Sequence, residues 1–345
     1  MGRSGKRKLS QSITIGALWR QWRDVLGRLG FDSAALDAKR LTSFALGLSD
    51  LEIATREGEA VDEAGAQRVV ELLQRRLTGE SVARIVGERE FYGLAFGLNA
   101  ATLEPRPETE MLVDLAIAAL PGGGRLLDLG TGTGAIAIAV LVNRPDATAL
   151  ATDLSAEALA AASGNAARHG VEDKIAFLQG SWFEPVGASP HPNPPLKGEG
   201  TPSSLGQSSG LNVEPKPLPL EGRGWGGGKP QPDTDLFDLI ISNPPYITSA
   251  VVETLAPEVR DFDPRLALDG GPDGLAPYRI IAAEAARYLS PGGRVLVEIG
   301  YDQGAAVTAL FVAAGFGNVA VHRDLAGLDR VISAHHINGI TRTAR

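Results

Sequence analysis

The sequence predicts an α/β protein: a doubly wound, mostly parallel sheet of the Rossmann-like class, preceded by a small helical domain. From residue 125 onwards, short apolar runs alternate with helical stretches, a rhythm typical of successive strand–helix–strand units. A glycine-rich turn follows the first of these runs, at the edge where such sheets bind their ligands. Before residue 80, the apolar residues recur at helical spacing, which predicts helices.

Composition narrows the class of protein. The 345 residues include 43% hydrophobic and 21% charged side chains, which is ordinary for a globular protein. No apolar run reaches the roughly 20 residues that span a bilayer, and no signal-peptide pattern is present, so we expect a cytoplasmic protein without a membrane partner. The chain has no cysteine, and the adjacent His335 and His336 lack carboxylates at ligand spacing, so we expect no metal site. The net charge of −8 argues against direct binding of nucleic acid.

The N-terminal third divides into three parts. Residues 1–12 are basic, and we expect a disordered tail. Residues 13–80 predict a domain of several short helices, because their apolar residues recur at helical spacing. Residues 81–110 form a connector in which Glu90–Gly93 predicts a hairpin, and Pro107 stands where the first turn of a helix tolerates proline.

The alternating pattern defines a second domain over residues 111–336. Its predicted strands are continuous apolar runs, typical of buried parallel strands. They are Leu126–Leu129, Ala147–Thr152, Ile175–Leu178, Phe237–Ser242, Val295–Ile299 and Val319–Val321. Residues 187–232 interrupt the pattern with 10 of the 22 prolines and 10 of the 42 glycines, which predicts a disordered insertion in a surface loop. Residues 337–345 form a C-terminal tail.

The glycine-rich turn predicts a cofactor site. It consists of Gly130, Thr131, Gly132, Thr133 and Gly134, between a strand and an apolar helix. Glycines allow close approach of a ligand, and the helix N-terminus adds free amide donors. Asp153 closes the next strand, 23 positions after Gly130, about where such folds place the carboxylate that binds ribose hydroxyls. The turn also fits the dinucleotide pattern, so an NAD enzyme and a turn without ligand stay open, although Asp128 favours S-adenosylmethionine.

The motif Asn243-Pro244-Pro245-Tyr246 predicts the chemistry. It follows a strand directly, at the carboxyl edge of the predicted sheet. An amide nitrogen is a poor nucleophile, because its lone pair is delocalised into the carbonyl. The side-chain carbonyl of Asn243 can accept one hydrogen of such an amide and the backbone carbonyl of Pro244 the other, which stabilises positive charge as it develops on the nitrogen. The prolines restrict the backbone, and Tyr246 can stack on the planar group. The motif therefore predicts methyl transfer to a planar amide or amino nitrogen.

Further stretches resemble the HemK/PrmC family, the glutamine N5-methyltransferases of peptide chain release factors. The matching stretches are Glu88–Leu94, Pro105–Glu110, Glu258–Gly271 and Glu298–Gly304. The resemblance implies a class I S-adenosylmethionine-dependent methyltransferase whose N-terminal helical domain recognises the substrate. It implies methylation of the glutamine of the Gly-Gly-Gln motif in class 1 release factors, which modulates translation termination. We expect a monomer with the release factor as its protein partner.

The resemblance also assigns the site by position. Gly130 to Gly134, Asp153 and Asn243 are implied to bind the cofactor, with Trp182 as an aromatic beside the adenine. Asn243, Pro244, Pro245 and Tyr246 are implied to bind the substrate glutamine, and Asn243, Pro244 and Tyr246 to take part in catalysis.

Two alternatives belong to other classes. A DNA adenine N6-methyltransferase shares the Asn-Pro-Pro-Tyr chemistry, but it must hold phosphates and flip a base, and the chain has neither a basic recognition region nor a positive net charge. A catalytically inactive binding module is the second alternative. The intact glycine turn, Asp153 and Asn243 argue against it.

Overall fold

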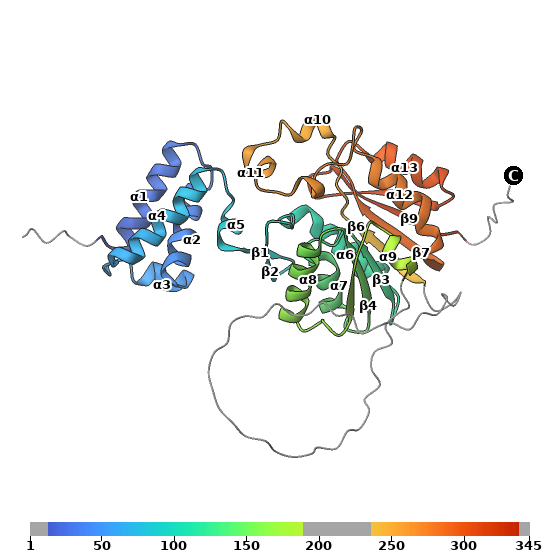
Figure 1. Cartoon of the computed structure of the whole chain (residues 1–345), viewed down its shortest axis with the longest axis horizontal. Coiled ribbons are helices and arrows are strands. Elements are labelled where there is room, and N and C mark those ends of the chain that lie inside the picture. The colour runs from blue at the N-terminus through green and yellow to red at the C-terminus, as the bar shows by residue number, and fades with distance from the viewer. Residues whose placement is uncertain (1–12, 189–235, 338–345) are drawn as a thin grey trace, which may run out of the picture.

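The computed structural model describes residues 13–188 and 236–337 (Figure 1). The two terminal tails, apart from residue 337, and residues 189–232 of the expected insertion lie outside the described residues. The first two residues of that insertion, Gly187 and Ala188, instead end the short helix α9.

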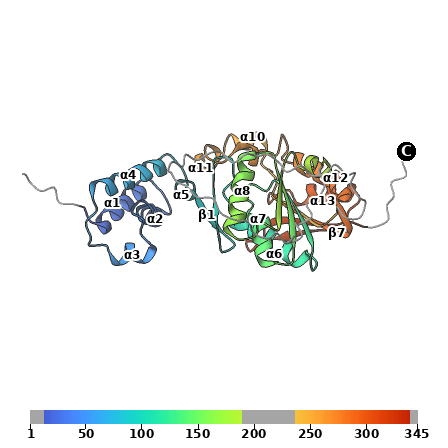
Figure 2. The same cartoon turned by 60° about the horizontal axis from the view of Figure 1, so that its bottom comes forward.

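The N-terminal helices form a body of their own at one end of the molecule (Figures 1 and 2). They are α1 (Ile15–Arg28), α2 (Ala34–Leu46), α3 (Asp50–Thr55), α4 (Glu63–Leu77) and α5 (Val82–Val86). Polar side chains cap several of their N-termini; Ser49 and Glu52 form a reciprocal capping box on α3. Leu26, Leu41 and Leu73 are fully buried between the helices, so this body has its own core.

The connector contains the predicted hairpin. Strands β1 (Glu88–Phe91) and β2 (Leu94–Gly97) pair antiparallel, and Tyr92 turns between them with a φ of 53°. A 3-10 turn, η1 (Pro107–Thr109), leads into α6 (Glu110–Ala119), with proline in the first turn as expected.

The second domain is a seven-stranded sheet in the order β5-β4-β3-β6-β7-β9-β8. Its strands are β3 (Arg125–Leu129), β4 (Thr148–Asp153), β5 (Ile175–Gln179), β6 (Phe237–Ser242), β7 (Leu289–Glu298), β8 (Gly317–Arg323) and β9 (Asp329–His335). The strands from β5 to β7 are parallel, and β9 runs antiparallel to both of its neighbours. The doubly wound, mostly parallel sheet is confirmed. All six predicted runs coincide with strands, although Ala147 and Ile299 lie one residue outside β4 and β7. The prediction missed β9, whose short apolar core is flanked by charged residues and histidines.

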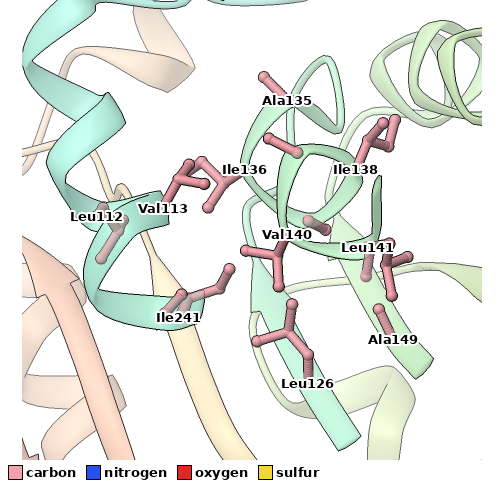
Figure 3. Close-up of a cluster of buried hydrophobic side chains, with 14 of the residues drawn as sticks. Leu112, Val113, Leu126, Ala135, Ile136, Ile138, Val140, Leu141, Ala149 and Ile241 are labelled. Carbon is pink, nitrogen blue, oxygen red and sulfur yellow. The ribbon is translucent and has the colours of Figure 1, made fainter. Parts of the chain in front are cut away.

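Helices cover both faces of the sheet (Figure 2). They are α6, α7 (Ala135–Asn143), α8 (Ala156–Arg168), α9 (Glu184–Ala188), α12 (Ala276–Glu284) with the 3-10 turn η3 (Ala285–Arg287), and α13 (Gly304–Ala313). Successive side chains of a strand point to opposite faces, so Leu126 joins the core under α6 and α7, whereas Leu127 joins the core under α12 and α13. Figure 3 shows the first of these cores, with Val113 of α6 facing Ile136 of α7.

The segment between β6 and α12 carries three short helical turns. They are α10 (Ser249–Val252), α11 (Pro257–Arg260) and η2 (Arg265–Ala267). This segment also meets the N-terminal body, because Asp263 pairs with Arg84 of α5. Among the described residues, no helix is both long enough and apolar enough to cross a membrane.

Candidate active site at the carboxyl edge of the sheet

A cavity of about 520 Å³ opens beyond the carboxyl ends of β3, β4 and β6, a size typical of small-molecule sites. Most of the residues proposed from the sequence line it together. These are Gly130, Thr131, Gly132, Thr133, Asp153, Trp182, Asn243 and Pro245. A smaller cavity of about 90 Å³ adjoins Asn243, and Pro244 and Tyr246 line that one instead.

The glycine turn is built by backbone conformation and by β4. Gly130 and Gly132 have φ values of 73° and 57°, which glycine adopts without strain. The backbone oxygen of Thr152 accepts hydrogen bonds from the amides of Gly130 (2.9 Å) and Thr131 (3.0 Å). Asp153 Oδ2 accepts one from the amide of Gly132 at 2.8 Å. The carboxylate proposed for the ribose therefore also holds the turn in shape.

Two glycines of the turn face different surroundings. A Cβ atom on Gly132 would meet no atom within 4 Å, so its place is open space in the cavity wall. A Cβ atom on Gly134 would lie 2.8 Å from Ile138 and 3.1 Å from Ala162. Gly134 does not line the cavity. The structure thus gives Gly134 a packing role, in which it lets α7 approach α8.

Asp128 lies fully buried beneath the turn. Its Oδ2 atom accepts a hydrogen bond from the Thr131 hydroxyl at 2.6 Å, while Oδ1 has no hydrogen-bond partner among the described residues. Burial raises the pKa of this carboxyl group to about 7. Hydrogen bonds from Thr131 and from the backbone of Ala137 act in the opposite direction and lower the pKa.

Trp182 closes the cavity on the β5 side. Its backbone has a φ of 49°, a strained conformation for a bulky residue. The Thr152 hydroxyl donates to its backbone oxygen at 3.1 Å. A ring atom of Trp182 lies 3.9 Å from where a Cβ atom of Gly130 would be, so the ring and the turn form one wall.

The loop Asn243–Tyr246, called the Asn243 loop below, is held by hydrogen bonds to β3 and to the connector. The hydroxyl of Ser242, the last residue of β6, donates to the backbone oxygen of Leu129 at 2.7 Å. The Nδ2 atom of Asn243 donates to Oγ1 of Thr109 at 3.2 Å. The amide of Asn243 is thus held on its nitrogen side, which leaves its Oδ1 atom as an acceptor.

Tyr246 is half-buried against the core under α12 and α13. Burial, followed by the charge of Glu298, raises the pKa of its hydroxyl to about 12. Its backbone oxygen accepts a hydrogen bond from Gln303 Nε2 at 3.0 Å. Tyr246 lines the smaller cavity and does not line the main one.

Sequence reasoning missed several side chains of the site. Thr109 and Arg106 line the main cavity, Glu298 lines the smaller one, and Gln303 holds the loop. Arg106 is paired with Asp263 at 2.8 Å. All four missed residues lie in stretches that match the HemK/PrmC pattern, but a match in pattern gives no role to a residue. No group of three or more metal-ligating side chains occurs within residues 13–188 and 236–337.

Comparison with known proteins decides the family. The PrmC N-terminal domain family matches residues 17–87, and the methyltransferase small domain family matches residues 108–202. The release factor glutamine methyltransferase of Agrobacterium fabrum is 39% identical over 310 residues, which cover 88% of this chain and 91% of that protein. The chain belongs to the release factor glutamine methyltransferase family. The Caulobacter vibrioides member is 38% identical over 326 residues, covering 93% of this chain and 96% of its own.

Membership of this family makes S-adenosylmethionine the cofactor, and the NAD alternative is not supported. Among solved structures, the release factor-specific protein-(glutamine-N5) methyltransferase of Alicyclobacillus acidocaldarius is 26% identical, with 68% of this chain and 94% of that chain covered and a TM-score of 0.34. The site suits this cofactor by its own features. The open space at Gly132, the Asp153 carboxylate and the Trp182 ring line one cavity.

Proposed function

We propose that this enzyme transfers a methyl group from S-adenosylmethionine to the side-chain amide nitrogen, N5, of the glutamine in the Gly-Gly-Gln motif of class 1 peptide chain release factors. By this reaction it would modulate translation termination. The observation that carries the proposal is the held amide of Asn243, whose nitrogen is bonded to Thr109 and whose oxygen is left for a ligand beside the main cavity.

The cofactor half of the proposed site is the wall around the glycine turn. Backbone groups of Gly130, Thr131, Gly132 and Thr133 would contact the cofactor, with Gly134 acting through packing. Asp153 would accept hydrogen bonds from the ribose hydroxyls, and Trp182 would lie along the adenine. Asn243 would also contact the cofactor, because it stands where both halves meet. The bound cofactor supplies an electrophilic methyl group.

The substrate half is the Asn243 loop. The Oδ1 atom of Asn243 and the backbone oxygen of Pro244 would accept the two hydrogens of the glutamine amide. Two acceptors fix the direction of the nitrogen and favour positive charge on it, which is electrostatic preorganisation. Pro245 would form the cavity wall, and Tyr246 would present a ring behind the planar amide. No strong base is required, since the methylated nitrogen loses its proton readily.

The protein substrate is favoured over DNA by two features. First, the chain matches the release factor glutamine methyltransferases named above along nearly their whole length. The N-terminal helical body is joined to the cavity through Asp263, which pairs with both Arg84 of α5 and Arg106 of the cavity wall. Contacts of a release factor with that body would thus supply binding energy that positions the glutamine. We propose that the enzyme acts as a cytoplasmic monomer without direct contact to nucleic acid.

A competition experiment tests this proposal. A purified release factor, its Gly-Gly-Gln glutamine→alanine variant and adenine-containing duplex DNA are each incubated with the enzyme and a methyl-labelled cofactor. We expect label on the wild-type factor alone. Label on DNA, or equal label on the variant factor, would contradict the proposal.

A further inference from the structure

Three side chains from distant parts of the chain meet behind the loop at β6. Asn243 follows β6 and Glu298 ends β7, and the parallel register pairs Ser242 with Val297, so the two side chains are neighbours at the same edge of the sheet. Thr109 comes from the connector and is 4% exposed, and Glu298 is 1% exposed. Asn243 Nδ2 donates to Thr109 Oγ1 at 3.2 Å, and Glu298 lies near enough that both side chains lower the pKa of its carboxyl group. The family pattern assigns no role to this arrangement.

We propose that Glu298 is a positioning residue that determines, through Thr109, which side of the Asn243 amide faces the substrate. The inference rests on the proposed function and names a group that sets its geometry. An ionised carboxylate can only accept hydrogen bonds. The Thr109 oxygen accepts from Nδ2 of Asn243 at 3.2 Å, and in the proposed arrangement the Thr109 hydroxyl donates its own hydrogen to the Glu298 carboxylate. With its nitrogen used in this way, Asn243 presents Oδ1 to the substrate amide.

Protonation of Glu298 removes this constraint. A protonated carboxyl group donates one hydrogen bond, so it can donate to the oxygen of Thr109. The Thr109 hydroxyl is then free to donate to Oδ1 of Asn243, and the amide turns its Nδ2 group towards the substrate. An –NH₂ group facing the –NH₂ group of glutamine places two donors against each other. The charge state of one buried carboxyl thereby decides whether the pocket accepts or repels the substrate nitrogen.

The groups around Glu298 place this change near neutral pH. Burial has the largest effect and raises its pKa to about 7, against the lowering effects of Thr109, Arg330 of β9 and Asn243; Glu108 of η1 raises it further. Arg330 is itself paired with Asp324 at 2.9 Å. The hydroxyl of Tyr278 donates to the backbone oxygen of Glu298 at 2.8 Å. One carboxyl oxygen, Oε2, has no hydrogen-bond partner among the described residues, so the ionised form is incompletely compensated.

The remaining neighbour is the phenol of Tyr246. Its pKa is raised to about 12, through burial first and then the charge of Glu298, so it stays neutral when Glu298 titrates. Arg106 also acts on that phenol. Turnover is therefore expected to rise with pH as Glu298 loses its proton, with a midpoint near its pKa of about 7.

The test compares variants of the full-length enzyme on a release factor between pH 5.5 and 9. Thr109→Ser keeps the hydroxyl, and Thr109→Val keeps the shape without it. We expect Thr109→Ser to retain the wild-type pH profile, and Thr109→Val to lose about tenfold in kcat, the usual scale for one hydrogen bond. Glu298→Gln should lose about 10- to 100-fold in kcat at pH 8, with a flat pH profile and unchanged KM for the cofactor. Tyr278→Phe removes the bond to the Glu298 backbone and a 3.5 Å contact with Gln303 Oε1 but leaves the Glu298 carboxyl group in place, so it should keep the wild-type pH profile.

Several outcomes would overturn the inference. Equal kcat for Thr109→Val and Thr109→Ser would do so, and so would a Glu298→Gln enzyme that keeps the wild-type pH dependence. A wild-type enzyme that does not methylate the release factor contradicts the proposed function instead. The ¹⁵N resonance of the Asn243 side-chain amide then tests whether Glu298 orients Asn243 through Thr109 (the relay), and this measurement needs no substrate. It should shift with pH in the wild type and not in Glu298→Gln; the same pH response in both proteins would overturn the relay.

Discussion

The two halves of the site are built in opposite ways. The cofactor half is local: the glycine turn follows β3, and its holding groups, Thr152 and Asp153, end the adjacent strand β4. The substrate half is assembled over long distances, since Asn243 is bonded to Thr109, which is 134 positions earlier in the chain. Gln303, 57 positions after Tyr246, holds the other end of the loop. The comparison shows that a local motif can be recognised from sequence, whereas the orientation and rigidity of its side chains depend on residues far away in the chain.

The largest effect is expected from Asn243→Ala. It removes the acceptor that is most important as charge develops on nitrogen, so kcat should fall by about 10²- to 10³-fold. Cofactor affinity should fall far less than kcat, because the glycine turn, Asp153 and Trp182 keep their contacts with the cofactor. Steady-state kinetics together with calorimetric titration of the cofactor measure both quantities. Near-normal turnover would remove Asn243 from the proposed chemistry.

Asp153→Ala should show the reverse division of effects. The variant loses charge-assisted hydrogen bonds to the ribose and the bond to the amide of Gly132. We expect cofactor binding to weaken by about 1.5–3 kcal/mol, as measured by calorimetry. Unchanged affinity in a folded variant would show that Asp153 only shapes the turn.

Asn243 and Asp153 belong to the part of the site that the sequence could predict. The glycine turn, Asp153 and the Asn-Pro-Pro-Tyr motif are short and follow apolar runs, so their place at the carboxyl edge of the sheet followed from the strand pattern. The roles of Thr109 and Glu298 could not be predicted, because they depend on which strands are neighbours and on the η1 turn. Strand β9 was missed since its central apolar stretch is short, and the packing role of Gly134 depends on the approach of α8.

Glu298→Gln should separate stability from activity. The folded-state pKa of Glu298 is raised from 4.5 to about 7, so the carboxyl destabilises the fold when it is ionised. That cost is absent well below pH 4.5 and is fully present above about pH 7. The neutral variant should therefore be more stable than the wild type at pH 8, on the order of 1–3 kcal/mol, with a much smaller difference at pH 5. Denaturant unfolding at the two pH values measures this, and a variant destabilised at pH 8 would contradict it.

The smallest effects distinguish two glycines of the same turn. Gly134→Ala places a Cβ atom against Ile138 and Ala162 at a positive φ, so it should lower the free energy of unfolding by about 1–3 kcal/mol. Gly132→Ala meets no protein atom and should cost about 1 kcal/mol from its positive φ alone, while weakening cofactor binding. Thermal unfolding and cofactor titration on both variants test this, and the opposite ranking of stabilities would count against the separate roles.

Mass spectrometry of a release factor tests the central claim most directly. The factor is incubated with the full-length enzyme and S-adenosylmethionine, digested, and its peptides are mapped, with Asn243→Ala as the control enzyme. The account predicts one added methyl group on the glutamine of the Gly-Gly-Gln peptide with the wild-type enzyme, and at most a trace with the control. A methyl group on another residue, or an unmodified Gly-Gly-Gln peptide after incubation with folded wild-type enzyme that binds the cofactor, would contradict it.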